Sequence, residues 1–151
     1  MSETALPKMS YSELIDEFEM GYEKLLNKVH SLKDERLYRF KLNESDWCIK
    51  EIIIHISDVE MIGYLRIRTV IAEPGQTIIR YDPDKWANEL NYITHSVSQA
   101  LEIVKVTRGT NAKLLRLIPI EKWSNTAIHS ESGEMSLYEV VEYFTNHLLH
   151  Q

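Results

Sequence analysis

The stretch WCIKEIIIHISDVEMIGYLRIRTVIA, residues 47–72, is the longest apolar segment of the chain and decides its fold. Its 6 charged residues exclude a membrane span of this segment. A cap residue at Ser45 or Asp46 precedes it and Pro74 follows it, so we expect one long helix between them. The residues of its predicted inner face recur at helical spacing, which is typical of an amphipathic helix: Ile52, Ile56, Val59, Ile62 and Gly63.

Capping boxes mark the predicted starts of two further helices. Ser10 is followed three residues later by Glu13, and apolar residues then recur at helical spacing to about Leu32. Ser136 is likewise followed three residues later by Glu139, and we expect the helix that begins there to continue to the end of the chain. The sequence therefore predicts one helix near each end of the chain.

A fourth helix is predicted between Asp82 and Pro119, because Asp82 is a cap residue and Pro83 suits the first helical position. Gly109 is expected to bend or weaken this helix midway. A short extended piece is expected at residues 126–129, and alternation typical of strands is weak elsewhere. Four amphipathic helices with long connections predict an all-α four-helix bundle.

Composition narrows the class of protein. The 151 residues include only 5 glycines and 4 prolines, which favours helices over a sandwich of short strands. We divide the chain into an N-terminal arm, residues 1–9, and one bundle domain, residues 10–151. The single cysteine, Cys48, cannot form an intramolecular disulfide, and no signal peptide is recognised, so we expect a cytoplasmic protein. Lys and Arg (17) are outnumbered by Asp and Glu (23), which argues against direct contact with nucleic acid.

Three histidines carry the candidate chemistry. His55 shares the predicted buried face of residues 47–72, whereas His147 and His150 lie three residues apart in the last helix. Three protein ligands around an open position are typical of a catalytic divalent-metal site. Asp58, one turn after His55, is a candidate to orient an imidazole ring as a hydrogen-bond acceptor. The alternative that spacing leaves open is a set of core histidines with ordinary hydrogen bonds.

Several short motifs follow one another along nearly the whole chain. They are the run Trp47–Asp58 around His55, Asp82 with Trp86, Arg108, Leu114-Leu115 with Trp123, and Gly133 followed 14 residues later by His147. In their order and spacing, from about residue 10 to the end, the sequence resembles the DinB-like superfamily of metal-binding four-helix bundles, which includes bacillithiol S-transferases. The resemblance implies a DinB-like four-helix bundle.

The resemblance also implies a metal site. In that family three histidines bind a divalent ion, often nickel or zinc, and His55 and His147 match two of these positions. Gln151 stands at the position of the third histidine, beside His150. Three alternatives follow: His150 is the third ligand, Gln151 supplies a carbonyl oxygen, or the site has lost its metal.

Two functions follow from the resemblance. The first is a metal-dependent enzyme, a thiol S-transferase or a hydrolase, that acts on a small molecule or a thiol. The second is a non-catalytic bundle with a degraded metal site that binds a small ligand or a protein partner in a stress response. Members of the family often pair through exposed helix faces, so we also expect a homodimer. Neither a membrane nor a nucleic acid is expected as a partner.

Overall fold

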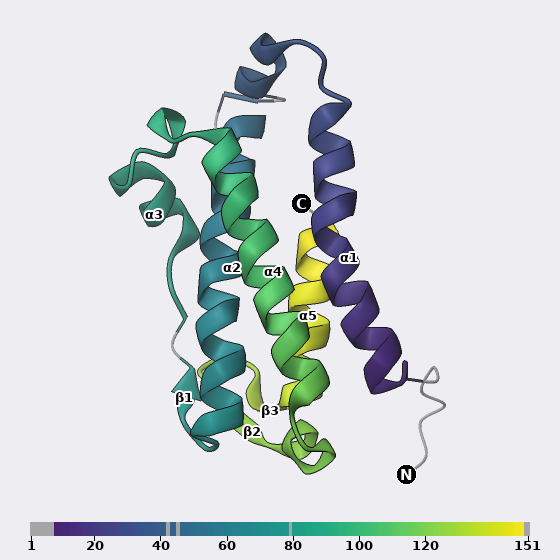
Figure 1. The fold of residues 1–151 in the computed structure, drawn as a ribbon. Coiled ribbons are helices and arrows are strands. Elements are labelled where there is room, and N and C mark those ends of the chain that lie inside the picture. Colours follow the sequence, from purple (N-terminus) through teal and green to yellow (C-terminus); the bar gives the residue numbers. More distant parts are fainter. Residues whose placement is uncertain (1–7, 42, 45, 79, 150–151) are drawn as a thin grey trace.

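The structure is a computed structural model that describes residues 8–41, 43–44, 46–78 and 80–149. Its four long helices are α1 (Tyr11–His30), α2 (Ile49–Ala72), α4 (Val97–Leu117) and α5 (Leu137–Leu149). They lie side by side as a bundle, in which α1 and α2 each pack against both α4 and α5 (Figure 1). The all-α four-helix bundle predicted from the sequence is therefore confirmed. No helix of the described ranges is both long and apolar enough to cross a membrane.

Both predicted capping boxes are present. The Ser10 hydroxyl accepts a hydrogen bond from the Glu13 backbone N–H at 3.1 Å, and the Glu13 carboxylate accepts one from the Ser10 N–H at 3.3 Å. The Ser136 hydroxyl accepts from the Glu139 N–H at 3.2 Å, and the Glu139 carboxylate accepts from the Ser136 N–H at 3.1 Å. Each box satisfies backbone donors that a helix start leaves without an intrahelical partner. These contacts fix where α1 and α5 begin.

The start of α2 differs from the prediction. The helix begins at Ile49 rather than at Trp47, and Cys48 takes the cap position in place of Asp46. The backbone of Cys48 is extended there, and its N–H donates to the Glu51 carboxylate at 3.0 Å. Glu51 therefore satisfies the cap backbone without a polar cap side chain. Ser45, the other predicted cap, lies outside the described residues.

The single helix predicted between Asp82 and Pro119 is wrong. The chain instead forms α3 (Pro83–Glu89), a 3₁₀ turn at Tyr92–Thr94 and then α4. The break falls at Asn91, which adopts a left-handed conformation with φ of 52°. Asparagine is one of the few residues that tolerate this conformation, so the backbone reverses direction here although the apolar spacing continues.

Three other features of this region concern its two helix caps and the predicted bend. The Asp82 carboxylate accepts the N–H groups of Asp84 and Lys85 at 3.0 and 3.1 Å, which confirms the predicted cap. Ser96 caps α4, because its hydroxyl accepts from the Gln99 N–H at 3.2 Å. Gly109, the predicted bend, lies inside continuous α4 helix.

A small sheet covers one end of the bundle, beside the start of α5 (Figure 1). Its strands are β1 (Thr77–Ile78), β2 (Thr126–His129) and β3 (Gly133–Ser136), and shorter 3₁₀ turns occupy Glu35–Arg39 and Ile120–Ser124. β2 pairs parallel with β1 and antiparallel with β3. The extended piece expected at residues 126–129 is confirmed, whereas its two partner strands were not predicted. The sheet brings segments far apart in the sequence to the same end of α2 and α5.

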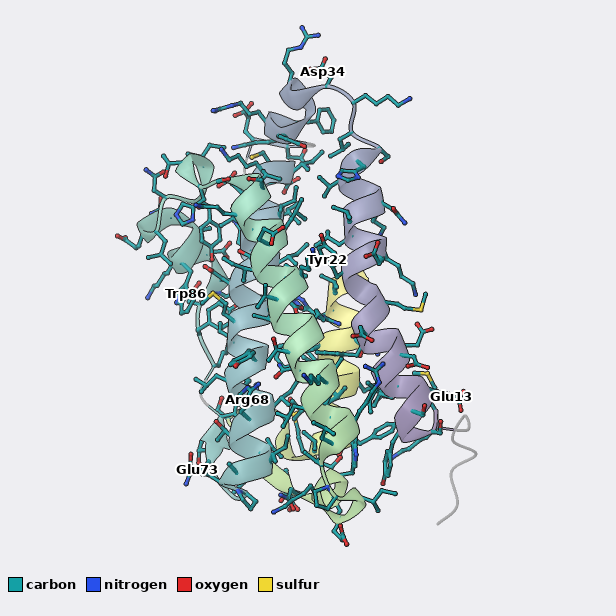
Figure 2. The ribbon with its side chains drawn as sticks, viewed as in Figure 1. Glu13, Tyr22, Asp34, Arg68, Glu73 and Trp86 are labelled. Carbon is teal, nitrogen blue, oxygen red and sulfur yellow. The ribbon has the colours of Figure 1, made fainter. Side chains whose placement is uncertain are left out.

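The helices approach one another closely in the core. A Cβ atom on Gly63 would lie 2.9 Å from Cδ1 of Phe144, so only a glycine lets α2 and α5 pack at this distance. Gly63 therefore lies on the inner face of α2, as its helical spacing predicted. Tyr22 lies between α1 and α4 among the side chains that fill the bundle (Figure 2).

One ion pair lies at the centre of the bundle. Arg108 of α4 is 1% exposed, and its Nε and Nη2 atoms each donate to the Glu60 carboxylate of α2 at 2.6 Å. The guanidinium also donates to the backbone carbonyls of Phe18 and Phe144, both at 2.7 Å. Arg108 thereby links all four helices of the bundle.

Candidate functional site

A cavity of about 520 Å³ opens between α2, α5, the segment that leads into α3, and the loop between β2 and β3. Apolar side chains from these elements form most of its wall: Trp47, Val59, Ile62, Ile78, Pro83, Met135, Val140 and Phe144. Polar and charged side chains complete it: His55, Arg66, Arg80, Tyr81, Asp84, His129, Glu131, Ser132, Tyr143 and His147. A cavity of this size that combines apolar walls with polar groups is typical of a small-molecule site.

His55 and His147 meet at this cavity. Their ring centres lie 5.6 Å apart with the planes inclined at 59°, although the residues come from α2 and α5. The ring centres of Trp47 and His55 lie 4.8 Å apart, so the indole also packs against the His55 ring. The structure therefore brings together the two histidines that the sequence singled out.

Burial keeps both imidazoles neutral. Burial lowers the pKa of His55, and the negative charge of Asp84 opposes that effect only in part. The pKa of His147 falls to about 4, mainly through burial and further through the positive charges of His55 and Arg108. A neutral imidazole has a ring nitrogen with a lone pair, which is the form that binds a metal ion.

The donor chemistry of this pair fits a divalent ion. His55 is 5% exposed, and its Nδ1 atom is buried without a hydrogen-bond partner among the residues that the structure describes. A buried ring nitrogen left in this state costs about 1–3 kcal/mol unless a ligand satisfies it. Two imidazoles that bind one tetrahedral ion have ring centres roughly 5 Å apart, close to the observed separation.

The third predicted ligand cannot be placed, because His150 and Gln151 both lie outside the described residues. Within the described ranges, no group of three or more His, Cys, Asp or Glu side chains is arranged to share an ion. Asp58, predicted to orient an imidazole, accepts a hydrogen bond from the Tyr92 hydroxyl at 2.5 Å. That contact ties the middle of α2 to the turn that follows α3.

Several cavity residues were not predicted. Arg66, Tyr81 and Tyr143 line it together with the histidines. The spacing of Arg66 could have identified it, because it follows His55 by 11 residues and therefore lies on the same helix face. Tyr81 and the residues around His129 reach the cavity only through the sheet, and no local pattern signals that.

His129 lines the cavity in a fixed orientation. Its Nδ1 atom accepts hydrogen bonds from the backbone N–H groups of Glu131 and Ser132 at 3.1 and 3.2 Å. The ring proton of its neutral form is therefore on Nε2, so His129 presents a hydrogen-bond donor. This ring is suited to hydrogen bonding rather than to joining the other two histidines as a ligand.

Comparison with known proteins finds a family model and several relatives that are similar to the chain. The family model of the DinB superfamily matches residues 17–150. Two proteins of Oceanobacillus iheyensis, each named "Putative metal-dependent hydrolase", are 28% and 26% identical to the chain. The first alignment covers 92% of this chain and 80% of the relative, and the second covers 83% and 71%. A Bacillus cereus protein of the same name is 26% identical, over 91% of this chain and 81% of its own length.

Two solved structures share the fold. YfiT from Bacillus subtilis, described as a probable metal-dependent hydrolase with an unusual four-helix bundle topology, superposes with a TM-score of 0.86 at 18% identity. That match covers 99% of this chain and 86% of YfiT. A mycothiol-dependent maleylpyruvate isomerase superposes with a TM-score of 0.72 at 11% identity, over 93% of this chain and 58% of that protein. At these identities both matches show the fold alone.

Proposed function

Because the chain belongs to the DinB superfamily, we propose that it is a divalent-metal-dependent enzyme in which His55 and His147 supply two ligands of the ion. The relatives' names favour hydrolysis as the reaction, and the size of the cavity favours a small molecule as the substrate. Nickel and zinc are among the ions that suit imidazole ligands. The third ligand is His150 or Gln151 in this proposal.

One observation carries the proposal. Nδ1 of His55 is buried and without a hydrogen-bond partner in the described part of the chain, at a cavity that a second neutral imidazole also lines. Core histidines that serve packing alone normally have their ring nitrogens hydrogen-bonded. An unsatisfied nitrogen beside a cavity is instead the arrangement expected of a side chain that awaits a ligand.

The residues around the pair have separate tasks in the proposed reaction. A divalent ion bound there would lower the pKa of a bound water or thiol and thereby supply a nucleophile near neutral pH. Trp47 shields the His55 ring from solvent on one side, and Phe144 lines the adjoining wall. Asp58 and Tyr92 anchor α2 to the α3 region, which keeps His55 at the cavity.

Thiol transfer is a second candidate reaction. The fold shared with a mycothiol-dependent isomerase favours it, because that protein's reaction depends on a low-molecular-weight thiol. Both reactions need the same pair of histidines, so the metal site is tested first and the two reactions are separated by supplying water alone or a low-molecular-weight thiol.

Metal content decides the proposal. Elemental analysis of untagged protein is expected to find close to one nickel or zinc ion per chain, and His55→Ala is expected to lose it. His30→Ala is the matched control, because His30 lies exposed at the end of α1 and its loss should leave the metal content unchanged.

The opposite result favours a different function. Protein that contains no metal and takes up neither added zinc nor added nickel would contradict the enzyme. A non-catalytic bundle that binds a small ligand or a protein partner would then be the better interpretation.

A further inference from the structure

The cavity has further polar side chains on the sheet side of the histidine pair, around Arg66. On α2, four residues at helical spacing line the cavity: His55, Val59, Ile62 and Arg66. Arg66 follows His55 by 11 residues, which is about 16 Å along the helix axis and almost the same face. One wall of the cavity therefore has an imidazole at one end, two aliphatic side chains in the middle and a guanidinium at the other end.

The facing helix continues this arrangement. α5 runs antiparallel to α2, so the last turns of α2 and the first turns of α5 both lie at the sheet end of the bundle (Figure 1). Tyr143 precedes His147 by one turn on α5 and lines the cavity, and Tyr81 lines it from the segment before α3. Both tyrosines lie close enough to Arg66 to interact electrostatically with its guanidinium. Tyr143 also lies against His147, with their ring centres 5.7 Å apart. Two phenol groups and a guanidinium thus line the cavity between the histidine pair and the sheet.

The charges of the cavity differ from end to end. Arg80 and Glu131 form a solvent-exposed ion pair at 2.7 Å, so their charges largely offset one another. Asp84 acts on His55 and places negative charge near the histidine end. Arg66 places a half-buried positive charge near the tyrosines, and burial lowers its pKa because the guanidinium has lost part of its water. A partly desolvated guanidinium binds a planar oxyanion more strongly than a fully hydrated one.

We propose that Arg66, together with Tyr81 and Tyr143, binds the carboxylate of an organic substrate whose apolar body lies along Val59 and Ile62. This orientation directs the other end of the substrate to His55 and His147. A single guanidinium matches one carboxylate, whereas a phosphate usually engages several donors or a helix N-terminus. The inference names the substrate class of the proposed enzyme and in that sense rests on the proposed function, although carboxylate binding itself requires no metal.

Two fluorescent probes that differ in a single charge test this site. Dansylglycine carries a carboxylate, and dansylglycinamide has the neutral amide in its place. Titration of metal-free protein is expected to show that Arg66→Met weakens dansylglycine binding about tenfold or more, since hydrogen bonds to charged groups contribute that much. Binding of the amide should change less than about twofold, because it makes no charge-assisted hydrogen bond.

Arg80→Met is the matched control, because Arg80 also lines the cavity but is exposed and paired with Glu131. It should leave the binding of both probes unchanged. If Arg66→Met fails to fold, as judged by its thermal unfolding, Arg66→Lys replaces it and is expected to bind dansylglycine several-fold more weakly, since an ammonium lacks the planar fork.

Three results would each overturn the carboxylate site. The first is no binding of dansylglycine to the wild-type protein. The others are an equal loss of affinity for both probes in Arg66→Met, and an equally large loss of dansylglycine affinity in Arg80→Met. The same titration in His55→Ala separates this inference from the metal site. Retained discrimination between the probes in His55→Ala would show that the carboxylate site does not depend on the metal ligands. Retained discrimination together with a wild-type protein that takes up no metal would support the carboxylate site while contradicting the proposed enzyme. Metal binding by the wild-type protein without that discrimination would support the proposed enzyme and contradict the carboxylate site.

Discussion

Two polar clusters lie inside the bundle, and they differ in how completely their hydrogen bonds are made. The guanidinium of Arg108 donates to both oxygens of Glu60 and to two backbone carbonyls, and both side chains are almost fully buried. The pair of His55 and His147 lies on the same two helices as Glu60 and Phe144, yet Nδ1 of His55 has no partner among the described residues. Among the described residues, the first cluster leaves no side-chain nitrogen without a partner, whereas the second leaves Nδ1 of His55 unsatisfied.

This difference distinguishes a structural cluster from a candidate functional cluster within the same bundle core. Each guanidinium nitrogen of Arg108 and both carboxylate oxygens of Glu60 have a hydrogen-bond partner. This buried charge pair links the helices, so Arg108 and Glu60 are assigned a structural role. A buried nitrogen without a partner lowers stability unless a ligand satisfies it. His55 and His147 line the cavity, whereas Arg108 and Glu60 do not, which agrees with that division.

The largest expected effect comes from breaking the complete cluster. Arg108→Met leaves the Glu60 carboxylate buried and unpaired, and it should lower the free energy of unfolding by about 3–5 kcal/mol. Urea denaturation at neutral pH measures it. The double variant Arg108→Met/Glu60→Leu should recover much of the loss, because it removes the unpaired charge as well.

Arg116 offers a matched control on the same helix. It bonds Asp16 at 3.0 Å and Glu19 at 2.9 Å, but at the surface. Arg116→Met should therefore cost no more than about 1 kcal/mol. Equal losses for Arg108→Met and Arg116→Met would show that the buried cluster contributes no more than a surface ion pair.

A smaller effect is expected where the two clusters meet. Phe144 gives its carbonyl to Arg108 and its ring packs on Gly63, while the same ring lines the cavity. Gly63→Ala would place Cβ 2.9 Å from that ring, so overpacking should cost about 1–3 kcal/mol. Because the displaced ring adjoins the histidines, metal affinity should fall as well, which a nickel titration followed by tryptophan fluorescence would measure.

The second helical glycine is the control for this change. A Cβ on Gly109 would meet nothing within 4 Å, and alanine is the better helix former, so Gly109→Ala should stabilise the protein by up to about 1 kcal/mol. A loss of stability in Gly109→Ala, or none in Gly63→Ala, would contradict the packing described for α2 and α5.

The parts of this molecule that sequence reasoning predicted are those specified locally. Ser10 with Glu13, and Ser136 with Glu139, form capping boxes within one turn of chain, and both were predicted and are present. The face of His55 was predicted because helical periodicity is a local property. The break at Asn91 was not, because apolar spacing continues across it and a left-handed conformation is an option for asparagine rather than a requirement.

The cavity depends on contacts that no local pattern encodes. Thr77 pairs with Ile128, 51 residues further along the chain, and this pairing brings the segment around Tyr81 and the loop around His129 to the same end of the bundle. A strand of two residues leaves almost no trace in the sequence. Local reasoning therefore identified His55 and His147 but missed the rest of the cavity lining, although the regular spacing along α2 could have pointed to Arg66.

The smallest expected effect tests the incomplete cluster directly. His55→Leu replaces the imidazole by an apolar side chain of similar size and removes the unsatisfied Nδ1 atom. In metal-free protein the free energy of unfolding should stay unchanged or rise by about 1 kcal/mol, because the described residues make no hydrogen bond to Nδ1 that could be lost and a buried polar atom disappears. Urea denaturation in the presence of a chelator measures this, and Glu60→Leu, five residues further along α2, should instead lose several kcal/mol. A loss of about 2 kcal/mol or more in His55→Leu would show that this imidazole already has a structural partner, and the division between the two clusters would then fail.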